Sequence, residues 1–345
     1  MKRFLPQEDK LADHINRQAG ILHKQLQALP VENLGMPHHC LHYFRSSHQS
    51  RLFFSIETSA ALLYRSISML GKSPADLVIM DYGAGVGTLY LLGKMIGCKK
   101  MIYNDFLSDW QFSAKKIADA LNIEIDEYIV GDIDATIRAL QEKQISCDII
   151  LSRNVIEHIY KLDDFYASIH SGQPRSLVYS STTANYFNPA THLQHVRWHR
   201  KWEKVYYVQR LELIKQQLTW IDESELTLLA TATRGLAGTD LQDAIDKYDH
   251  TKFLPDPNEH YTNTCTPDQG IWVEHLLTFK EYRKLIGRAN YAVTFLPGFW
   301  DTNYQARWKN VFARMFNAII KLVGRAGFLL APFIYVIAEP IERKS

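Results

Sequence analysis

The most constraining feature of this chain is an apolar run at residues 77–80 that leads into an acid and three alternating glycines, Asp81-Tyr82-Gly83-Ala84-Gly85-Val86-Gly87. An apolar run of this length, stopped by turn residues, is typical of a buried parallel strand. The glycines predict a tight turn, because glycine adopts backbone conformations that other residues avoid and has no Cβ to block a close approach. We expect a helix to follow from Thr88 to Ile96, with free amide donors at its N-terminus.

The spacing of the glycines distinguishes between kinds of nucleotide site. A dinucleotide fingerprint, G-x-G-x-x-G, needs a third glycine at the position of Thr88. A P-loop needs G-x-x-x-x-G-K-[ST], but the interval from Gly87 to Gly93 is one residue too long, and Met95 replaces the hydroxyl residue. The pattern that remains is D-x-G-x-G-x-G.

Three later stretches follow the same plan of an apolar strand with polar residues at its end. The first, residues 100–105, ends in Asp105, where a carboxylate could accept both hydroxyls of a ribose. The second, residues 127–133, contains Asp132. The third, residues 147–159, leads into the sequence Asn-Val-Ile-Glu-His. The order of these elements predicts an α/β fold with its polar residues at the carboxyl ends of the strands.

Over about residues 70–185, these four elements resemble the class I S-adenosylmethionine-dependent methyltransferases. The resemblance implies a doubly wound, mostly parallel seven-stranded sheet with S-adenosyl-L-methionine as the cofactor. It also implies that residues 1–75 form a helical N-terminal cover and that residues 185–270 form a helical insertion for the acceptor. The cofactor core would span residues 76–184, and residues 271–345 would complete the sheet.

The resemblance further implies a set of cofactor-binding residues in the glycine loop and at the ends of the strands: Asp81, Gly83, Ala84, Gly85, Gly87, Asp105, Phe106, Asp132, Ile133, Arg153 and Asn154. Asp81 would meet the methionine amino group directly or through water, and Asp105 would hold the ribose. Asp132 and Ile133 would contact the adenine, and Asn154 would lie near the reactive methyl. The plainer alternatives are a helix cap for each acid, a turn residue for Asn154 and a surface charge for Arg153.

His158 is the first candidate for a general base, because it follows the fourth strand and imidazole can take up a proton near neutral pH. The alternative is that His158 packs on the following helix and shapes the cofactor pocket. We expect the neighbouring Glu157 to point to solvent.

A histidine trio, His192, His195 and His199, has spacings of three and four that place it on one helix face. The trio could contact the acceptor or act as a base. It lacks the H-E-x-x-H signature and a carboxylate partner, so no metal site is predicted. Aromatic residues could line an acceptor pocket, although helical spacing is more typical of a core: Trp198, Trp202, Tyr206, Tyr207, Trp220, Trp272, Phe299 and Trp300.

Composition limits the classes of partner. The formal charge of +2 over 345 residues gives no electrostatic argument for nucleic-acid binding. The four cysteines form no C-x-x-C pair, and the first ten residues lack the apolar core of a signal peptide. We therefore expect a reducing, cytoplasmic setting.

The C-terminal region raises the question of membrane contact. Residues 328–338 are apolar but contain Pro332 and are too short to span a bilayer, which needs ~20 residues. The preceding helix, about residues 304–323, combines basic and apolar residues without an acid. We expect it to pack on the sheet with solvated basic residues; the alternative is a helix that lies on an anionic membrane surface.

These patterns together predict an enzyme that transfers a methyl group to an oxygen or nitrogen atom of a small-molecule acceptor. The alternatives are methyl transfer to a lipid or lipid-linked acceptor, aminopropyl transfer from the same cofactor, and a non-catalytic S-adenosylmethionine-binding module. An acidic cluster for a cationic acceptor is not evident after the fourth strand. Neither the acceptor nor the oligomeric state follows from the sequence.

Overall fold

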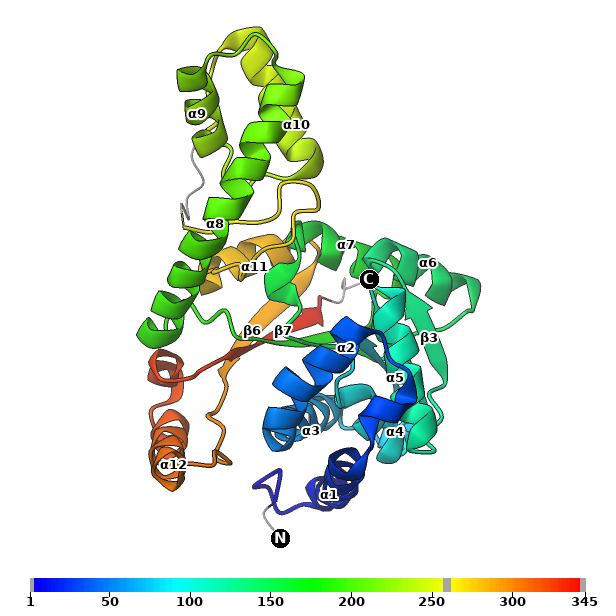
Figure 1. Ribbon diagram of the computed structural model, residues 1–345. Coiled ribbons are helices and arrows are strands. Elements are labelled where there is room, and N and C mark those ends of the chain that lie inside the picture. The colour runs from blue at the N-terminus through cyan, green and yellow to red at the C-terminus, as the bar shows by residue number, and fades with distance from the viewer. Residues whose placement is uncertain (1–2, 257–261, 342–345) are drawn as a thin grey trace.

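The computed structural model describes residues 3–256 and 262–341 (Figure 1). Its centre is a seven-stranded sheet with the order β3-β2-β1-β4-β5-β7-β6. The first five strands in this order pair in parallel, and β7 pairs antiparallel with both β5 and β6. The strands are β1 (Val78–Tyr82), β2 (Lys100–Asp105), β3 (Glu127–Val130), β4 (Ile149–Arg153), β5 (Leu177–Thr182), β6 (Tyr291–Pro297) and β7 (Ile334–Pro340).

Helices cover both faces of the sheet, because successive residues of each buried strand point to opposite sides. In β1, Ile79 belongs to one hydrophobic core and Met80 to another. The first core contains residues from α4 (Leu89–Met95) and α5 (Ser108–Ala120), and the second contains residues from α6 (Ile133–Glu142), α7 (Leu162–Gly172) and α11 (Phe279–Gly287). The expected doubly wound, mostly parallel architecture is confirmed.

The N-terminal helices pack on the first of these faces. Ile15 of α1 and Ile56 of α3 are fully buried in the same core as Ile79. The segments are α1 (Lys10–Ala28), η1 (Val31–Leu34), α2 (His38–Tyr43), η2 (Phe44–His48), η3 (Gln49–Arg51), α3 (Leu52–Leu70) and η4 (Pro74–Asp76).

The predicted insertion forms a group of helices that projects from the body of the molecule (Figure 1). It consists of α8 (Pro189–Gln217), α9 (Glu223–Ala232) and α10 (Gly238–Thr251). Asp222 caps α9, because its side chain accepts a hydrogen bond from the backbone N–H of Glu225. The three helices share a small core that includes Ile214, Leu229 and Ile245.

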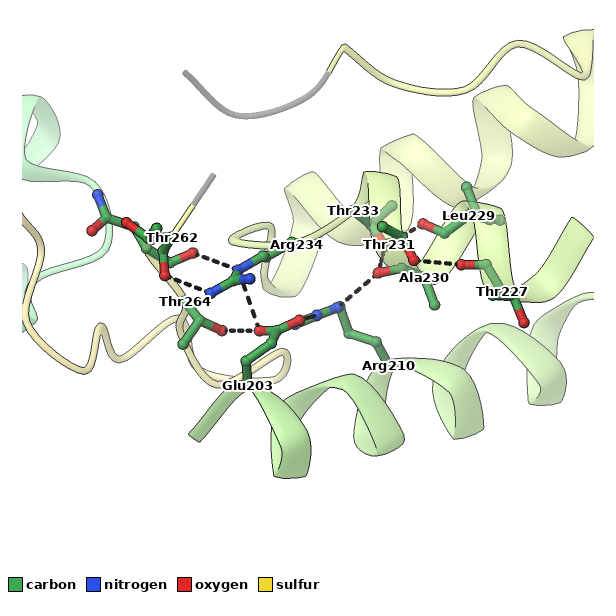
Figure 2. Close-up of polar contacts among 11 residues, drawn as sticks. Glu203, Arg210, Thr227, Leu229, Ala230, Thr231, Thr233, Arg234, Thr262 and Thr264 are labelled. Carbon is green, nitrogen blue, oxygen red and sulfur yellow. Dashed lines mark hydrogen bonds and ion pairs between the residues drawn. The ribbon is translucent and has the colours of Figure 1, made fainter. Parts of the chain in front are cut away.

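The carboxylate of Glu203 connects several segments of this insertion (Figure 2). Glu203 of α8 accepts hydrogen bonds from the fully buried Arg210 and from Thr264, the latter at 2.5 Å. Its Oε2 also lies 3.5 Å from Nε of Arg234, whose guanidinium donates to the carbonyl oxygens of Thr262 and Asn263. The Glu203 carboxylate thus links α8 with two segments that are distant in the sequence.

The C-terminal part completes the sheet. Thr278 and Glu281 form a reciprocal capping box at the start of α11. After β6 come α12 (Arg307–Leu322) and η6 (Gly324–Leu329). The expectation that this helix packs on the sheet is wrong: α12 contacts mainly η6 and lies beside the body of the molecule (Figure 1). No helix among the described residues is long and apolar enough to cross a membrane.

Candidate active site

A crevice of about 360 Å³ opens at the carboxyl ends of β1 and β4. The glycine loop, residues 83–87, forms one wall, and Asp81, Arg153, Asn154 and His158 also line it. The strand order reverses between β1 and β4, because β2 and β3 lie on one side and β4 and β5 on the other. Such a switch point is where open α/β sheets bind their ligands.

The N-terminal helices close this crevice from another side. Tyr43 of α2, His48 of η2 and Trp110 of α5 contribute to its lining. Residues of α3 approach the same place, since Ser59 Oγ lies 2.8 Å from Oγ1 of Thr88 at the end of the loop. Residues of the N-terminal segment thus lie beside the glycine loop, and their role as a cover for a bound cofactor stays a prediction.

Two glycines of the loop have different reasons to be glycine. Gly85 has φ +54°, and a Cβ placed on it would meet no atom within 4 Å, so the loop leaves open space there. Gly83 has φ +67°, and a Cβ would come within 2.5 Å of a methyl group of Val155. Both need the left-handed backbone region, but only Gly85 leaves free space of the kind that a close ligand requires.

Asp81 is buried at the back of the crevice, where one carboxylate oxygen accepts the backbone N–H of Tyr90 at 3.0 Å. This bond satisfies an amide in the first turn of α4. Burial raises the pKa of Asp81 to about 7, and the nearby Arg153 guanidinium opposes that rise. A cationic group placed in the crevice would stabilise the ionised form.

Arg153 lies at the end of β4 and is half-buried, so it is not the exposed surface charge of the plainer alternative. Its Nη1 donates to Oγ of Ser55 at 2.9 Å and to Oγ1 of Thr58 at 3.1 Å. Burial lowers the pKa of Arg153, while Tyr43 and Asp81 raise it. The cation is thus held by hydroxyl groups of α3 beside the glycine loop.

Asn154 follows with φ +58°, in the left-handed region that asparagine tolerates better than most residues. Its backbone N–H donates to the carbonyl of Ser181 in β5 at 2.8 Å. Asn154 and Arg153 line both this crevice and a second pocket of about 420 Å³. Hydroxyl residues are frequent in the second pocket: Ser46, Ser47, Ser50, Ser55, Thr58, Ser181 and Thr183.

Asp105 lies beside the crevice rather than in its lining. One of its oxygens accepts the N–H of Gly85 at 2.8 Å, and the other accepts the N–H of Leu107 at 3.2 Å. Burial raises the pKa of Asp105, and these backbone donors oppose the rise. A carboxylate has about four acceptor positions, so the backbone donors do not use all of them. Phe106, the next residue, is 61% exposed and outside the lining.

Asp132 is exposed and caps α6, where its Oδ1 accepts the N–H of Ala135 at 2.8 Å. The alternative of a helix cap therefore describes what Asp132 does in this structure. Ile133 is half-buried next to it, and neither residue is among those that line the crevice. Their contact with an adenine stays a prediction.

His158 lines the crevice, and a hydrogen bond defines which of its ring nitrogens carries the hydrogen. Nδ1 lies 2.8 Å from the carbonyl oxygen of Trp272, and since a carbonyl only accepts, Nδ1 carries the hydrogen. In the neutral ring, Nε2 is then an acceptor. This tautomer suits a group that takes a proton from a ligand.

Two neighbouring carboxyl groups near the second pocket, the buried Glu157 and the half-buried Glu274, were not anticipated. Glu157 is completely buried, so the expectation that it points to solvent is wrong. Oγ1 of Thr183 lies 3.5 Å from Oε1 of Glu157 and 3.3 Å from Oε2 of Glu274. Burial raises the pKa of both acids, and the proximity of Glu157 adds to the effect on Glu274. Glu274 follows no recognisable motif, so only the structure could find this pair.

The histidine trio and the exposed tryptophans of α8 lie outside the lining of the crevice and of the second pocket. Of the histidine trio, His195 and His199 are buried, and His199 Nε2 lies 2.8 Å from the Glu274 carbonyl. No group of three or more potential metal-ligating side chains occurs in residues 3–256 and 262–341. Trp198 and Trp202 are exposed, and neither lines the crevice or the second pocket.

The chain matches no protein-family profile and no curated protein. Among solved structures, a methyltransferase from Mesorhizobium loti is 14% identical, with a TM-score of 0.40 over 81% of this chain and 97% of that one. Magnesium protoporphyrin IX methyltransferase from Synechocystis is 12% identical, with a TM-score of 0.38 over 87% and 97%. A putative methyltransferase from Listeria monocytogenes is 12% identical, with a TM-score of 0.41 over 82% and 100%.

These similarities are distant, so the fold is identified from the sheet itself. Five parallel strands in the order β3-β2-β1-β4-β5 are followed by an antiparallel β7 inserted before β6. The glycine loop lies directly after β1, at the switch point of the sheet. The sheet topology and the position of the glycine loop therefore agree with the doubly wound sheet that the sequence resemblance implied.

Proposed function

We propose that this protein transfers a methyl group from S-adenosyl-L-methionine to an oxygen or nitrogen atom of a small-molecule acceptor. The observation that carries the proposal is the pair of adjoining pockets that share Arg153 and Asn154. A transfer between two bound molecules needs two such spaces with one common wall. The crevice at the glycine loop would take the cofactor, and the hydroxyl-rich second pocket would take the acceptor.

The residues of the crevice fit the polar groups of this cofactor. Asp81 would accept from its ammonium group, and the cationic Arg153 would attract its carboxylate. The free acceptor positions of Asp105 would hold the ribose hydroxyls, and Asp132 with Ile133 would contact the adenine. The open space at Gly85 supports a close approach of the ligand to the backbone. When bound, the cofactor supplies an activated methyl group.

The protein's own contribution would be alignment, exclusion of water and removal of a proton from the acceptor. Asn154 would position the reacting groups, since it belongs to both pockets. His158 would take the proton at Nε2, because the Trp272 carbonyl holds the hydrogen on Nδ1. The neighbouring carboxyl groups of Glu157 and Glu274 would influence the acceptor side through Thr183.

We also propose a reducing, cytoplasmic setting for the enzyme. All four cysteines lie in the described part of the chain, and each is a buried free thiol. Oxidised, secreted chains of this kind more often use their cysteines in disulfides.

Release of S-adenosylhomocysteine tests the proposed activity. The wild-type chain is incubated with S-adenosylmethionine and a panel of hydroxyl and amine acceptors. We expect acceptor-dependent product from at least one class, and at least tenfold slower turnover in His158→Gln with nearly unchanged cofactor affinity. Loss of cofactor affinity alone in that variant would show that His158 only shapes the pocket.

One observation favours a second candidate, methyl transfer to a lipid or lipid-linked acceptor. Helix α12 exposes apolar side chains next to basic ones. The loop before α12 also reaches the second pocket, because Asp301 lies 4.0 Å from Nε of Arg51, which lines that pocket. Lipid-linked acceptors in the same panel would distinguish the two candidates.

A further inference from the structure

Helix α12 has three distinct faces. Its inner face includes the buried Ala313 and Ile320. A second face is apolar but exposed; we call it the outer stripe, and it consists of Trp308, Val311, Phe312, Met315 and Leu322. Positions separated by three, four and seven residues lie on one side of a helix, so these side chains form a continuous row.

The outer stripe is unusual for a helix on a protein surface, where the outward face is normally polar. Trp308 is 63% exposed and Leu322 is 86% exposed. The row runs from Trp308 to Leu322 along this helix, so it is about 21 Å long at a rise of about 1.5 Å per residue. Contiguous exposed apolar surface of this kind indicates an interaction site.

A row of positive charge runs along one flank of the outer stripe. Arg307, Arg314 and Lys321 are exposed and seven residues apart, which places them in line along two-turn intervals. Arg325 continues the positive charge into η6. Residues 302–338 contain five basic side chains and no acidic one. The partner of this surface must therefore combine apolar groups with negative charge.

A second copy of the chain does not have that combination. Two outer stripes packed together would bring their basic rows close to each other, and no acid on either helix would offset the repulsion. An anionic bilayer surface satisfies both requirements, since its headgroups meet the basic row and its acyl region accepts the apolar side chains.

The space behind α12 has a similar character. A cavity of about 610 Å³ lies between α12, β6 and α3. Apolar residues such as Leu296, Phe299 and Phe328 line it, together with the basic Arg65, Lys321 and Arg325 and the acidic Glu57. Apolar walls with three basic side chains and one acid match an anionic amphiphile better than they match the polar surface of an acidic protein.

We infer that α12 docks the protein on an anionic membrane surface, with the outer stripe in the interface and the basic row against the headgroups. Docking of this kind is independent of the proposed methyl transfer, because no residue of α12 lines the crevice or the second pocket. The amphipathic helix lies in the plane of the membrane and does not span it.

Vesicle flotation with the full chain tests the inference. The vesicles contain phosphatidylcholine alone or with about 30% phosphatidylglycerol. We expect at least tenfold tighter binding to the anionic vesicles, weakened when salt rises from about 50 to 300 mM, because screening reduces headgroup attraction. Failure of the wild-type chain to bind anionic vesicles at micromolar concentration would overturn the inference.

Two sets of substitutions separate the apolar and basic contributions. The first is Trp308→Ser with Phe312→Ser and Met315→Ser, and the second is Arg307→Gln with Arg314→Gln and Lys321→Gln. We expect each triple variant to lose at least tenfold in vesicle binding. Because these side chains are exposed, both variants should retain the far-UV circular dichroism and cofactor affinity of the wild type.

A matched control comes from α8, which also exposes apolar side chains. Trp198→Ser with Trp202→Ser and Val205→Ser removes a comparable exposed surface, and vesicle binding should stay within twofold of the wild type. Vesicle binding that depends on α8 and not on α12 would overturn the inference. So would sedimentation data in which the outer stripe is required for a dimer and not for vesicle binding.

Discussion

Basic side chains have opposite environments in two regions of this molecule. In the insertion Arg210 is fully buried, and at the crevice Arg153 is half-buried; hydroxyl, carbonyl or carboxylate groups of the chain accept hydrogen bonds from both. Along α12, Arg307, Arg314 and Lys321 are exposed beside exposed apolar side chains.

The difference shows two roles of basic side chains: some hold the fold and the site, and others are available to an external partner. A buried cation requires partners at all times, since an uncompensated charge in the interior is costly. Arg153 and Arg210 are therefore committed to fixed positions in the site and the fold. An exposed basic row has no such requirement, and it remains available for a large anionic surface. Substitutions at the crevice and in the insertion should strongly change stability or cofactor affinity. Substitutions on α12 should change these properties little, and their effect should be seen in membrane binding.

The largest effect on stability is expected for Glu203→Ala. The substitution leaves Arg210 and Arg234 without their shared carboxylate (Figure 2). Removing one partner of a buried ion pair costs about 3–5 kcal/mol in the free energy of unfolding. Urea unfolding followed by tryptophan fluorescence measures the loss, because Trp198, Trp202 and Trp220 lie in the insertion.

Glu223→Ala provides the matched control for this experiment. Glu223 also forms an ion pair, with Lys215 at 2.9 Å, but both side chains are largely exposed. Exposed pairs contribute little to stability. The urea midpoint of this variant should equal that of the wild type, and an equal loss in the two variants would show that burial of the arginines is not what matters.

Asp105→Ala tests the internal region by ligand affinity. We expect S-adenosylmethionine to bind more weakly by roughly 1.5–3 kcal/mol, because charge-assisted hydrogen bonds to the ribose are lost. Isothermal titration calorimetry gives the difference directly. Asp119→Ala, which alters an exposed acid of α5, should bind as the wild type does. Unchanged affinity in a folded Asp105→Ala variant would remove the ribose assignment.

A smaller effect on stability depends on pH and involves His195 in α8. Burial and the neighbouring histidines lower the pKa of His195 to about 4. The unfolded chain therefore binds a proton near pH 6.5 that the folded chain does not bind, so stability decreases as the pH falls through this window towards 4. Between pH 7 and 5, this term amounts to about 1–2 kcal/mol.

Comparison with His195→Gln isolates that contribution, because the variant lacks the titrating group. Urea midpoints at pH 7 and pH 5 should differ less in the variant than in the wild type. An equal difference in both proteins would show that His195 is not held neutral by the fold.

The smallest effect is expected for Arg314→Gln on α12. Its exposed guanidinium should contribute nothing measurable to the urea midpoint or to cofactor affinity in the absence of lipid. Thermal unfolding and calorimetry check both expectations. A substantial destabilisation would mean that the basic row serves the fold, and the contrast between the two regions would disappear.

The sequence predicted the sheet well because buried parallel strands leave clear signals. Apolar runs and turn residues identified β1 to β4, and the alternation of Ile79 and Met80 between two cores follows from the strand geometry. The glycine loop and Asn154 also lie where the spacing suggested.

The rest of the site depends on tertiary contacts that no local pattern encodes. Glu274 is far from Glu157 in the sequence, and only the packing at Thr183 brings the two carboxyls together. The position of the Arg153 guanidinium likewise depends on hydrogen bonds to hydroxyls of α3. For α12, the amphipathic pattern was visible, but the sequence could not indicate that the apolar face would remain exposed.

Calorimetric titration of the purified chain with S-adenosylmethionine, S-adenosylhomocysteine and NAD tests the central claim most directly. The crevice, with its open space at Gly85 and its charged pair Asp81 and Arg153, predicts micromolar binding of the first two ligands and none of NAD. A well-folded sample that binds neither S-adenosylmethionine nor S-adenosylhomocysteine, or that prefers NAD, would contradict it.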